Sequence, residues 1–447
     1  MKGLALCVAA LAVGCARTAT PATSAYEAQS PPTPTFELEG KPFCFAGSNN
    51  YYAIYKPQPV VEDLFASAQA LGLKVLRVWG MLDRGSLDGS VPNADGSGEK
   101  DGVYFQYWDA AANRPAYNDG PNGLARLDQV LASAARHDVR LIVVLTNNWR
   151  PFGGMDQYLL WYGRHRHHEF YETSEIKQAY RAWLEHVITR KNGLNGRIYR
   201  DDPTIFGWEL ANEPRCNDGS AFDTPDGCGP ATLTGWAREM SDYVKSLDGN
   251  HLVSVGDEGF LNQQGEHFAY RAEGGVDSAA LTALPSVDFG TFHLYPEDWG
   301  TPAGFAERWI KDHAALARRL GKPTLLEEYG VKVQRAPDNR GEVSAGFAER
   351  RDAYRRYSNW ALQSGVGAAL PWMLAGVDAD GARYPDYDQY AFYRDDATGQ
   401  LIRGFAQDFA RAPACTSARA TTQPASPFVR VERRKQPVAL GWLAPTL

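Results

Sequence analysis

Short runs of apolar residues alternate along this chain with longer stretches in which apolar residues recur every three or four positions. The short runs are rich in Val, Leu, Ile and Phe, which is typical of strands buried on both faces of a parallel sheet. Eight runs of this kind each predict a strand. They occupy residues 43–47, 75–79, 141–146, 204–209, 252–255, 287–292, 323–327 and 368–372.

The stretches between these runs predict helices. In VVEDLFASAQALG, residues 60–72, apolar residues recur at helical spacing until Gly72, where the helix is expected to end. Strands that alternate with helices indicate a parallel α/β fold, and eight of them favour a closed (β/α)8 TIM barrel. An open sheet is the alternative, but no glycine-rich nucleotide loop follows the first run. We expect a single domain over residues 36–412.

The composition limits which kinds of molecule the protein is expected to bind. The length of 447 residues suits one barrel with insertions, and 44% hydrophobic residues allow a large core. The net charge is −7, with no basic block before the extreme C-terminus, which argues against a nucleic-acid partner. The 12 Trp and 22 Tyr residues suit sugar rings, whose flat C–H faces stack on aromatic side chains.

The N-terminus predicts export. Residues 1–15 read MKGLALCVAALAVGC, in which one Lys precedes an apolar stretch of about eleven residues, as in a signal peptide. The run LAVGC resembles a bacterial lipobox, although Ala12 stands where Leu is usual, and it predicts a lipid anchor at Cys15. An ordinary export signal that contains a cysteine is the alternative. We expect a protein anchored at the envelope or surface of a bacterium or, without the anchor, extracellular or periplasmic.

Two further segments and the cysteines bear on the domain organisation of the chain. Residues 16–35 are rich in Thr, Ser and Pro and predict an extended tether. Residues 413–447 are Thr/Ser/Pro-rich, then basic, then apolar, and we expect a loosely ordered tail. Cys216 and Cys228 flank a loop rich in turn-forming residues, which predicts a disulfide between them. Cys44 and Cys415 are a second candidate pair.

Polar or aromatic residues follow every predicted strand. In a barrel such residues meet at one mouth. Two carboxylates facing each other across an aromatic cleft can hydrolyse a glycosidic bond, one as acid and the other as nucleophile or base. Glu213 follows the fourth run, Glu327 ends the seventh and Glu328 follows it, on the opposite side of such a mouth. The eight strand ends read GSNNYY, RVWG, TNNW, ELANEPR, GDEGF, HLYPEDW, EEYG and PWM.

These motifs together resemble glycoside hydrolase family 5, a family of (β/α)8 retaining glycosidases. WELANEPRC, residues 208–216, is similar to the family's fourth-strand motif, and RVWG, FHLYPEDWG, LLEEYG and PWM stand in the family's order. The stretches NNWRPFGGMDQY and ELANEPRC resemble the β-mannanase branch rather than the cellulases. The resemblance covers about residues 40–410 and implies an enzyme without a cofactor.

The resemblance implies two catalytic residues. Glu213 is expected to be the general acid and base, for which we expect a raised pKa. Glu328 is expected to be the nucleophile, because the family's nucleophile stands directly before an aromatic residue and a glycine. Neighbouring strand residues point to opposite faces, so Glu327 is expected to be structural and paired with Arg or Lys behind the barrel. Glu209, inside its strand, is also expected to be structural.

The resemblance also implies the substrate-binding region. Arg77 is expected to keep the nucleophile ionised, Asn212 to hydrogen-bond the sugar 2-hydroxyl, and Tyr295 to orient the nucleophile. His293 is expected to approach the acid/base, and Trp372 to lie under the sugar at the cleaved bond. The remaining candidates for substrate binding are Trp79, Asn148 and Trp149.

One histidine tract is typical of metal sites. His165, His167 and His168 lie on a long charged connection after the third strand. Two-carboxylate hydrolysis needs no metal, and no Cys/His zinc spacing is present. We expect no metal site.

We therefore expect a monomeric retaining endo-β-1,4-mannanase that acts on mannan, glucomannan or galactomannan. An exo-β-mannosidase or another β-1,4-glycanase such as a cellulase would use the same chemistry. The long stretches 81–120 and 150–173 decide between endo and exo action if they close one end of the cleft. A non-catalytic carbohydrate-binding surface lipoprotein is the alternative of another class.

Overall fold

The computed structural model describes residues 34–95, 100–217, 227–333, 346–413 and 426–431, which belong to one compact unit. The predicted signal peptide, Cys15 and nearly all of the predicted tether therefore lie outside the described residues. Within the described ranges, no helix combines the length and the apolar character that crossing a lipid bilayer requires.

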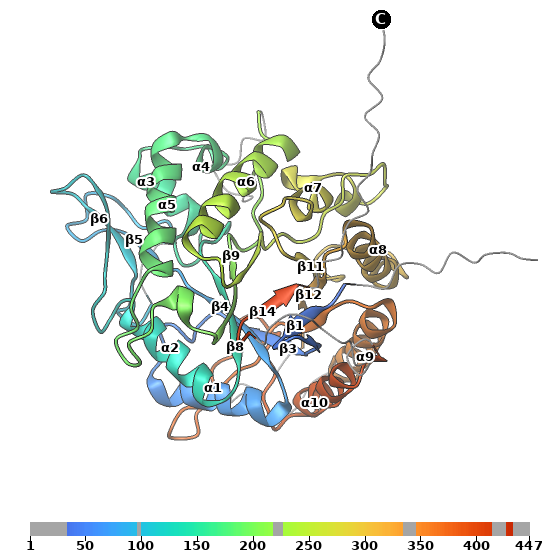
Figure 1. Ribbon diagram of the computed structural model, residues 1–447. Coiled ribbons are helices and arrows are strands. Elements are labelled where there is room, and N and C mark those ends of the chain that lie inside the picture. The colour runs from blue at the N-terminus through green and yellow to red at the C-terminus, as the bar shows by residue number, and fades with distance from the viewer. Residues whose placement is uncertain (1–33, 96–99, 218–226, 334–345, 414–425, 432–447) are drawn as a thin grey trace, which may run out of the picture. The chain divides into compact units, whose positions relative to one another are not determined.

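Eight parallel strands form the centre of the domain (Figure 1). They pair in two ladders, in the orders β10-β9-β8-β4-β3 and β11-β12-β13. Ser48 Oγ donates to Pro371 O at 2.8 Å and joins β3 to β13. Asp288 N donates to Val253 O at 2.8 Å and joins the entry of β11 to β10. The strands are β3 (Gly47–Asn50), β4 (Val75–Trp79), β8 (Arg140–Val144), β9 (Ile205–Glu209), β10 (Leu252–Ser254), β11 (Gly290–Leu294), β12 (Thr324–Tyr329) and β13 (Ala368–Pro371).

Helices lie outside these strands, so that the predicted (β/α)8 barrel is confirmed (Figure 1). The first helix begins after Pro57 and ends at Gly72, whose φ of 78° lies in the left-handed region that favours glycine at helix ends. The helices are α1 (Gln58–Leu71), α2 (Ala125–Arg136), α3 (Gly154–Trp161), α4 (Glu169–Glu172), α5 (Ser174–Ile188), α6 (Pro230–Leu247), α7 (Ser278–Thr282), α8 (Phe305–Leu320), α9 (Phe347–Ser364) and α10 (Ala397–Ala410).

The first barrel strand differs from its prediction. The apolar run 43–47 was expected to form it, but β3 begins at Gly47 and contains Ser48, Asn49 and Asn50. These polar residues are fully buried, and their side chains donate to backbone carbonyl groups of β12, of β13 and of the loop after β13. A hydrophobic pattern cannot identify a strand whose side chains are satisfied in this way.

A small antiparallel sheet covers the opposite end of the barrel from the strand ends that carry the candidate residues. It has the order β14-β1-β2, with β1 (Phe36–Leu38), β2 (Lys41–Phe43) and β14 (Val429–Val431). Phe36 and Val429 pack with apolar residues of the barrel strands, including Phe206. The expectation of a loosely ordered tail is therefore wrong for residues 429–431, because burial of Val429 holds this segment on the barrel.

A second small sheet follows β4. It contains β5 (Asp83–Ser86), β6 (Gln106–Asp109) and β7 (Arg114–Tyr117) in that order. It lies in the stretch 81–120 that we considered as a wall of the cleft. Within it Gln106 donates to Asp83 at 2.7 Å, and Gln106 also donates to Tyr158 OH of α3 at 2.9 Å, deep in the interior.

Candidate active site

A cleft of about 910 Å³ lies at the carboxyl ends of the barrel strands. Its residues follow β3, β4, β8, β9, β10, β11, β12 and β13, so all eight strands contribute to it. The lining includes Tyr51, Tyr55, Lys56, Trp79, Asn147, Trp149, Asn212, Glu213, Arg215, Glu258, Tyr295, Trp299, Glu328, Trp372, Tyr384 and Tyr390. Charged groups at the centre of an aromatic cleft suit a polar ligand with flat apolar faces.

Glu213 lies in the loop that follows β9, in an unusual backbone conformation. Its φ is 51°, in the left-handed region, although it precedes Pro214 and carries a side chain. Such strain is held only where surrounding contacts maintain it. Here Glu213 Oε1 lies 2.6 Å from His293 Nδ1, and Trp149 Nε1 donates to Glu213 Oε2 at 2.5 Å. The local fold thus aims one carboxylate into the cleft.

The pKa expected for Glu213 is wrong in direction. Burial raises it, but His293, Arg215 and Trp149 outweigh burial and lower the pKa of Glu213 to about 2. A carboxylate that accepts hydrogen bonds beside a positive charge is stabilised in its ionised form. Glu328, Glu213 and Glu327 raise the pKa of His293 well above its usual value despite burial, which favours a protonated imidazole beside Glu213, and the sequence pattern could not reveal this.

Glu328 lies across the cleft at the end of β12. Arg77 Nη1 donates to Glu328 Oε1 at 2.5 Å, and Tyr295 OH donates to Glu328 Oε2 at 2.7 Å. Burial raises the pKa of Glu328 above its usual value, while His293, Arg77 and Tyr295 counter that rise. Arg77 and Tyr295 therefore both contact Glu328, and their expected functions beside a nucleophile stay predictions.

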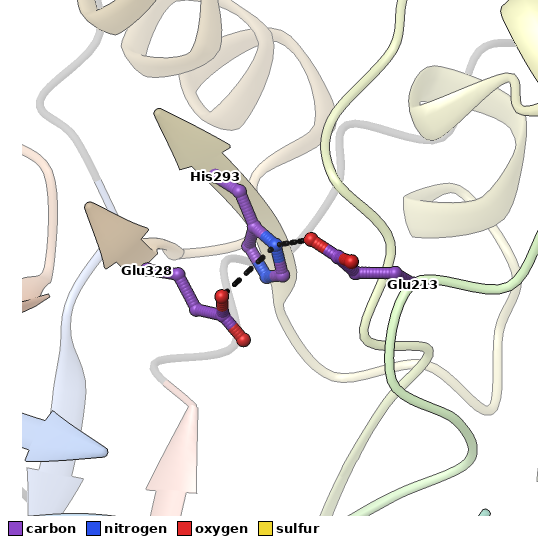
Figure 2. Close-up of side chains that lie close together, drawn as sticks. All are labelled: Glu213, His293 and Glu328. Atoms are coloured by element: carbon purple, nitrogen blue, oxygen red, sulfur yellow. Dashed lines mark hydrogen bonds and ion pairs between the residues drawn. The ribbon is translucent and has the colours of Figure 1, made fainter. Parts of the chain in front are cut away.

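The two candidate catalytic carboxylates lie close together. One oxygen of Glu213, one oxygen of Glu328 and one ring nitrogen of His293 lie within 4.8 Å of one another. Figure 2 shows the imidazole between the two carboxylates. A separation near 5 Å is typical of retaining glycosidases, whereas inverting enzymes leave room for a water molecule.

Glu327 does not lie behind the barrel as expected. It is fully buried, and its Oε2 lies 3.6 Å from Arg77 Nε and 3.5 Å from His293 Nε2. The β11–β12 register shifts here, because Phe292 pairs with Leu326 while His293 pairs with Glu328. Glu327 is the extra residue of a β-bulge, which breaks the alternation of side chains. Both glutamates of the EEYG motif therefore reach the interior of the barrel mouth.

Arg77 and Asn212 are held by a network beneath the cleft. Arg77 Nη2 donates to Asn212 Oδ1 at 2.7 Å, and Arg77 also contacts Glu209 at 2.6 Å, as the structural prediction for Glu209 requires. Asn212 Nδ2 donates to Asn147 Oδ1 at 2.9 Å. Since an amide nitrogen has two donors, one hydrogen of Asn212 remains for a ligand in the cleft. Arg77 and His293 are fully buried and do not line the cleft, so they act on the glutamates rather than on the substrate.

The prediction that Asn148 contacts substrate is wrong. Its side chain is fully buried, and its oxygen faces His167 Nε2 at 2.9 Å and accepts from Arg215 N at 2.9 Å. Its neighbour Asn147 lines the cleft instead. His167 was noted in the histidine tract, but Asp156 lies 2.8 Å from its other ring nitrogen. His167 therefore supports the loop after β8.

Aromatic residues form one wall of the cleft. Trp372 is half-buried and donates through Nε1 to Asp388 at 2.7 Å. Its ring lies 5.9 Å from the nearly parallel ring of Tyr51 and 5.7 Å from that of Trp79. The predicted positions of Trp79, Trp149 and Trp372 in the cleft agree with the structure. Tyr51, which joins this wall, was not predicted, because a half-buried tyrosine after a strand has no distinctive pattern.

Other residues of the site were also missed. Arg215 and Glu258 form an ion pair of 2.5 Å at the side of the cleft near β9 and β10. Tyr384 OH contacts Tyr55 at 3.1 Å on the β3 and β13 side. Arg215 and Glu258 stand in the motifs ELANEPR and GDEGF. Their position after the end of a strand was the signal from which they could have been predicted.

The predicted disulfide is present, since Cys216 and Cys228 are bonded across the loop after β9. Cys44 is also disulfide-bonded, while its predicted partner Cys415 lies outside the described residues. Within the described ranges, the one group with metal-ligand spacing is Glu213, His293 and Glu328. Their ligand atoms already contact one another, Arg77 or Tyr295. These contacts do not favour a metal.

A (β/α)8 barrel with a glutamate pair across its carboxyl-end cleft defines a glycoside hydrolase of the barrel type. Residues 33–363 match the model of the glycoside hydrolase family 5 β-mannosidase-like proteins. The chain belongs to this family.

Its relatives have related names. A probable mannan endo-1,4-β-mannosidase C from Aspergillus terreus is 41% identical over 303 residues, which cover 66% of this chain and 71% of that protein. A mannan endo-1,4-β-mannosidase F from Aspergillus clavatus is 38% identical, over 68% of this chain and slightly less than two thirds, 64%, of that protein. The crystal structure of an endo-1,4-β-mannanase from Rhizomucor miehei is similar, with a TM-score of 0.75 and 36% identity, and covers 85% of this chain and 98% of that one.

Proposed function

We propose that this protein is a retaining endo-β-1,4-mannanase that hydrolyses internal mannosyl bonds of mannan, glucomannan or galactomannan. The observation that carries the proposal is the pair Glu213 and Glu328, whose oxygens lie within 4.8 Å in an aromatic cleft. The names of the relatives from Aspergillus terreus and Rhizomucor miehei support mannan as the substrate.

The reaction has two steps in this proposal. Glu328 attacks the sugar C1, the C1–O bond breaks with its electron pair on the leaving oxygen, and Glu213 gives that oxygen a proton. Water then attacks C1, Glu213 takes the water proton, and the bond to Glu328 breaks with its electron pair on the carboxylate. Arg77 and Tyr295 stabilise the charge that returns to Glu328.

Internal cleavage requires space on both sides of the glutamate pair. The lining includes Tyr384 and Tyr55 near β13 and β3, and also Arg215 and Glu258 near β9 and β10. These strands stand on opposite sides of the barrel, since β3 adjoins β13 while β9 and β10 lie at the other end of the ladder. This extent supports endo rather than exo action.

Digestion of mannohexaose, run beside mannan and carboxymethylcellulose, tests the proposal. We expect a mixture of short manno-oligosaccharides from the start, little release from carboxymethylcellulose, and a first product with the β configuration. Mannose alone from the start would indicate an exo-β-mannosidase, and faster release from carboxymethylcellulose would indicate a cellulase. Tight mannan binding without any hydrolysis would identify the binding-lipoprotein alternative.

Two variants separate the catalytic residues from the fold. Glu328→Ala is expected to reduce hydrolysis to background, and Glu213→Ala to reduce it by about 10²- to 10⁴-fold. Glu349→Ala is the matched control, because Glu349 is exposed at the start of α9, away from the cleft. Hydrolysis by Glu328→Ala at the wild-type rate would refute the mechanism.

We also propose that the protein is exported, anchored by lipid at Cys15, and active as a monomer. The support is the LAVGC run of the sequence and the fact that one chain supplies both glutamates. Metabolic labelling with a fatty acid is expected to mark the wild type and not Cys15→Ala. Secretion of wild-type protein that carries no fatty-acid label would instead indicate an ordinary export signal without a lipid anchor. Sedimentation of the protein without its N-terminal segment tests the monomer.

A further inference from the structure

Glu327 has a buried carboxylate for which the reaction above has no use. The bulge in β12 places it beneath the cleft, and neither of its oxygens forms a hydrogen bond within the described residues. An ionised carboxylate without partners is costly to bury, so its neighbours must offset that cost. Arg77 Nε at 3.6 Å and His293 Nε2 at 3.5 Å are the nearby cationic groups. Arg77 and His293 keep the pKa of Glu327 below its usual value despite burial.

Arg77 alone cannot balance the negative charge at this place. Its guanidinium contacts Glu209 at 2.6 Å and Glu328 at 2.5 Å in addition to Glu327. One positive charge therefore faces three buried carboxyl groups. Burial raises the pKa of Glu209 well above its usual value, so Glu209 can hold a proton. Glu327 and Glu328 still exceed the single charge of Arg77, and His293 is the group placed to supply a second cation.

His293 is surrounded by acidic groups from several elements. Its Nδ1 lies 2.6 Å from Glu213 and 3.7 Å from Glu328, and its Nε2 lies 3.5 Å from Glu327. Asp257 and Glu258, after β10, also interact with it electrostatically, although Glu258 is paired with Arg215. Burial alone would lower the pKa of His293, but Glu328, Glu213 and Glu327 raise it well above its usual value.

The position of Nε2 indicates where a proton lies. His293 Nε2 has no hydrogen-bond partner within the described residues, and the nearest acidic atom is the oxygen of Glu327, which also has none. An unprotonated Nε2 would direct its lone pair at a buried carboxylate oxygen, which is repulsive. A protonated Nε2 is attracted to the same oxygen. Nε2 therefore carries a proton, whether the proton between Nδ1 and Glu213 lies on the nitrogen or on the carboxylate oxygen.

We propose that Glu327 is a positioning residue, whose carboxylate holds a proton on His293 Nε2 so that one further proton is shared between His293 Nδ1 and Glu213 Oε1. Glu327 then acts through His293 and does not touch the substrate. This shared proton is the one that the leaving oxygen receives in the first step of the reaction, although Glu213 itself is mostly ionised.

The proton balance closes over one turnover. In the first step the shared proton goes to the leaving oxygen, and the imidazole retains its Nε2 proton as a neutral ring. In the second step Glu213 takes a proton from the attacking water and shares it again with Nδ1. Glu327 remains ionised throughout. Loss of its charge should release the shared proton at lower pH, because an imidazolium is less stable without a nearby anion.

The first test is the ionisation of His293 in the full chain, which does not depend on catalysis. The ring nitrogens of labelled histidine report protonation by NMR, and the signal of His293 is assigned by its loss in His293→Ala. We expect Nε2 of the wild type to stay protonated from about pH 5 to about pH 8. In Glu327→Gln we expect the apparent pKa of His293 to fall by about one unit or more. An unprotonated Nε2 in the wild type would overturn the proposal even if the variant fails to fold.

The second test is kinetic and rests on the proposed function. The alkaline limb of kcat/KM reports loss of the shared proton, so Glu327→Gln should move it to lower pH by about one unit. Asp248→Asn is the matched control, because Asp248 is likewise a buried carboxylate beside a histidine, His251 at 2.6 Å, and neither residue lines the cleft. An equal shift in both variants would overturn the proposal. Absence of mannan hydrolysis with His293 behaving as expected would instead refute the proposed function.

Discussion

Glu327 and Glu328 are consecutive residues of β12, yet both carboxylates approach the guanidinium of Arg77, at 3.6 Å and 2.5 Å. In a regular strand one of the two side chains would point away. The bulge places a nucleophile candidate and a second negative charge on the same side of the barrel mouth. The electrostatics of the site therefore belong to a group of buried charges and not to two isolated glutamates.

The first prediction concerns Tyr295. Its hydroxyl donates to Glu328 at 2.7 Å and thereby lowers the pKa of that carboxyl. Tyr295→Phe removes the donor, so the pKa of Glu328 rises and the nucleophile becomes protonated at higher pH. We expect the acid limb of kcat/KM to move to higher pH, with kcat/KM reduced about tenfold to hundredfold. Tyr270→Phe is the control, since Tyr270 likewise donates to a carboxylate, Asp312 at 2.7 Å, and does not line the cleft. An unmoved acid limb in Tyr295→Phe would contradict the prediction.

The second prediction concerns the aromatic wall. Trp372 lines the cleft and is oriented by Asp388, so Trp372→Ala removes a flat surface from the sugar site. We expect kcat/KM on mannohexaose to fall at least about tenfold, with the fold intact by circular dichroism. Trp360→Ala makes the same truncation at a half-buried tryptophan of α9 outside the cleft. An equal loss of kcat/KM in the two variants would mean that Trp372 acts only through stability.

The third prediction separates two neighbouring asparagines. Asn147 lines the cleft and accepts from Asn212, whereas Asn148 is buried between His167 and the chain at Arg215. Asn147→Ala should lower kcat/KM, with a smaller loss of stability, because the cleft lets water replace the hydrogen bonds that Asn147 forms with Asn212 and Pro151. Asn148→Ala leaves buried polar groups without partners and should cost about 1–3 kcal/mol of the free energy of unfolding. Urea unfolding and initial rates on both variants distinguish the two effects, and the reverse pattern would show that the assignment of this loop is wrong.

The fourth prediction concerns the disulfide after β9. Cys216 and Cys228 close a loop with a sequence separation of 12, so the bond restricts the unfolded chain. Replacement of both by Ser should lower the free energy of unfolding by about 3 kcal/mol. The double variant is preferable to a reductant, because Cys44 is also disulfide-bonded. Unchanged unfolding in urea, with the wild-type bond verified by mass spectrometry, would contradict the prediction.

Prediction from sequence succeeded where the information is local. The strand and helix pattern predicted the barrel because buried parallel strands are continuously apolar, and it failed at β3, whose Asn49 and Asn50 are buried through hydrogen bonds. The residues Glu213 and Glu328 followed from their motifs at strand ends. Asn148 was preferred over Asn147 because a motif does not report which of two adjacent side chains turns into the cleft.

The sequence by itself determined the fold class, the glutamates at the mouth and the spacing of Cys216 and Cys228, because each depends on residues near one another in the chain. Only the tertiary structure decided the rest. The bulge that turns Glu327 inward depends on pairing between β11 and β12, and the low pKa of Glu213 depends on His293, 80 residues away. Burial, register and the interaction of charges are properties of contacts between distant segments, and these exist only after the chain has folded.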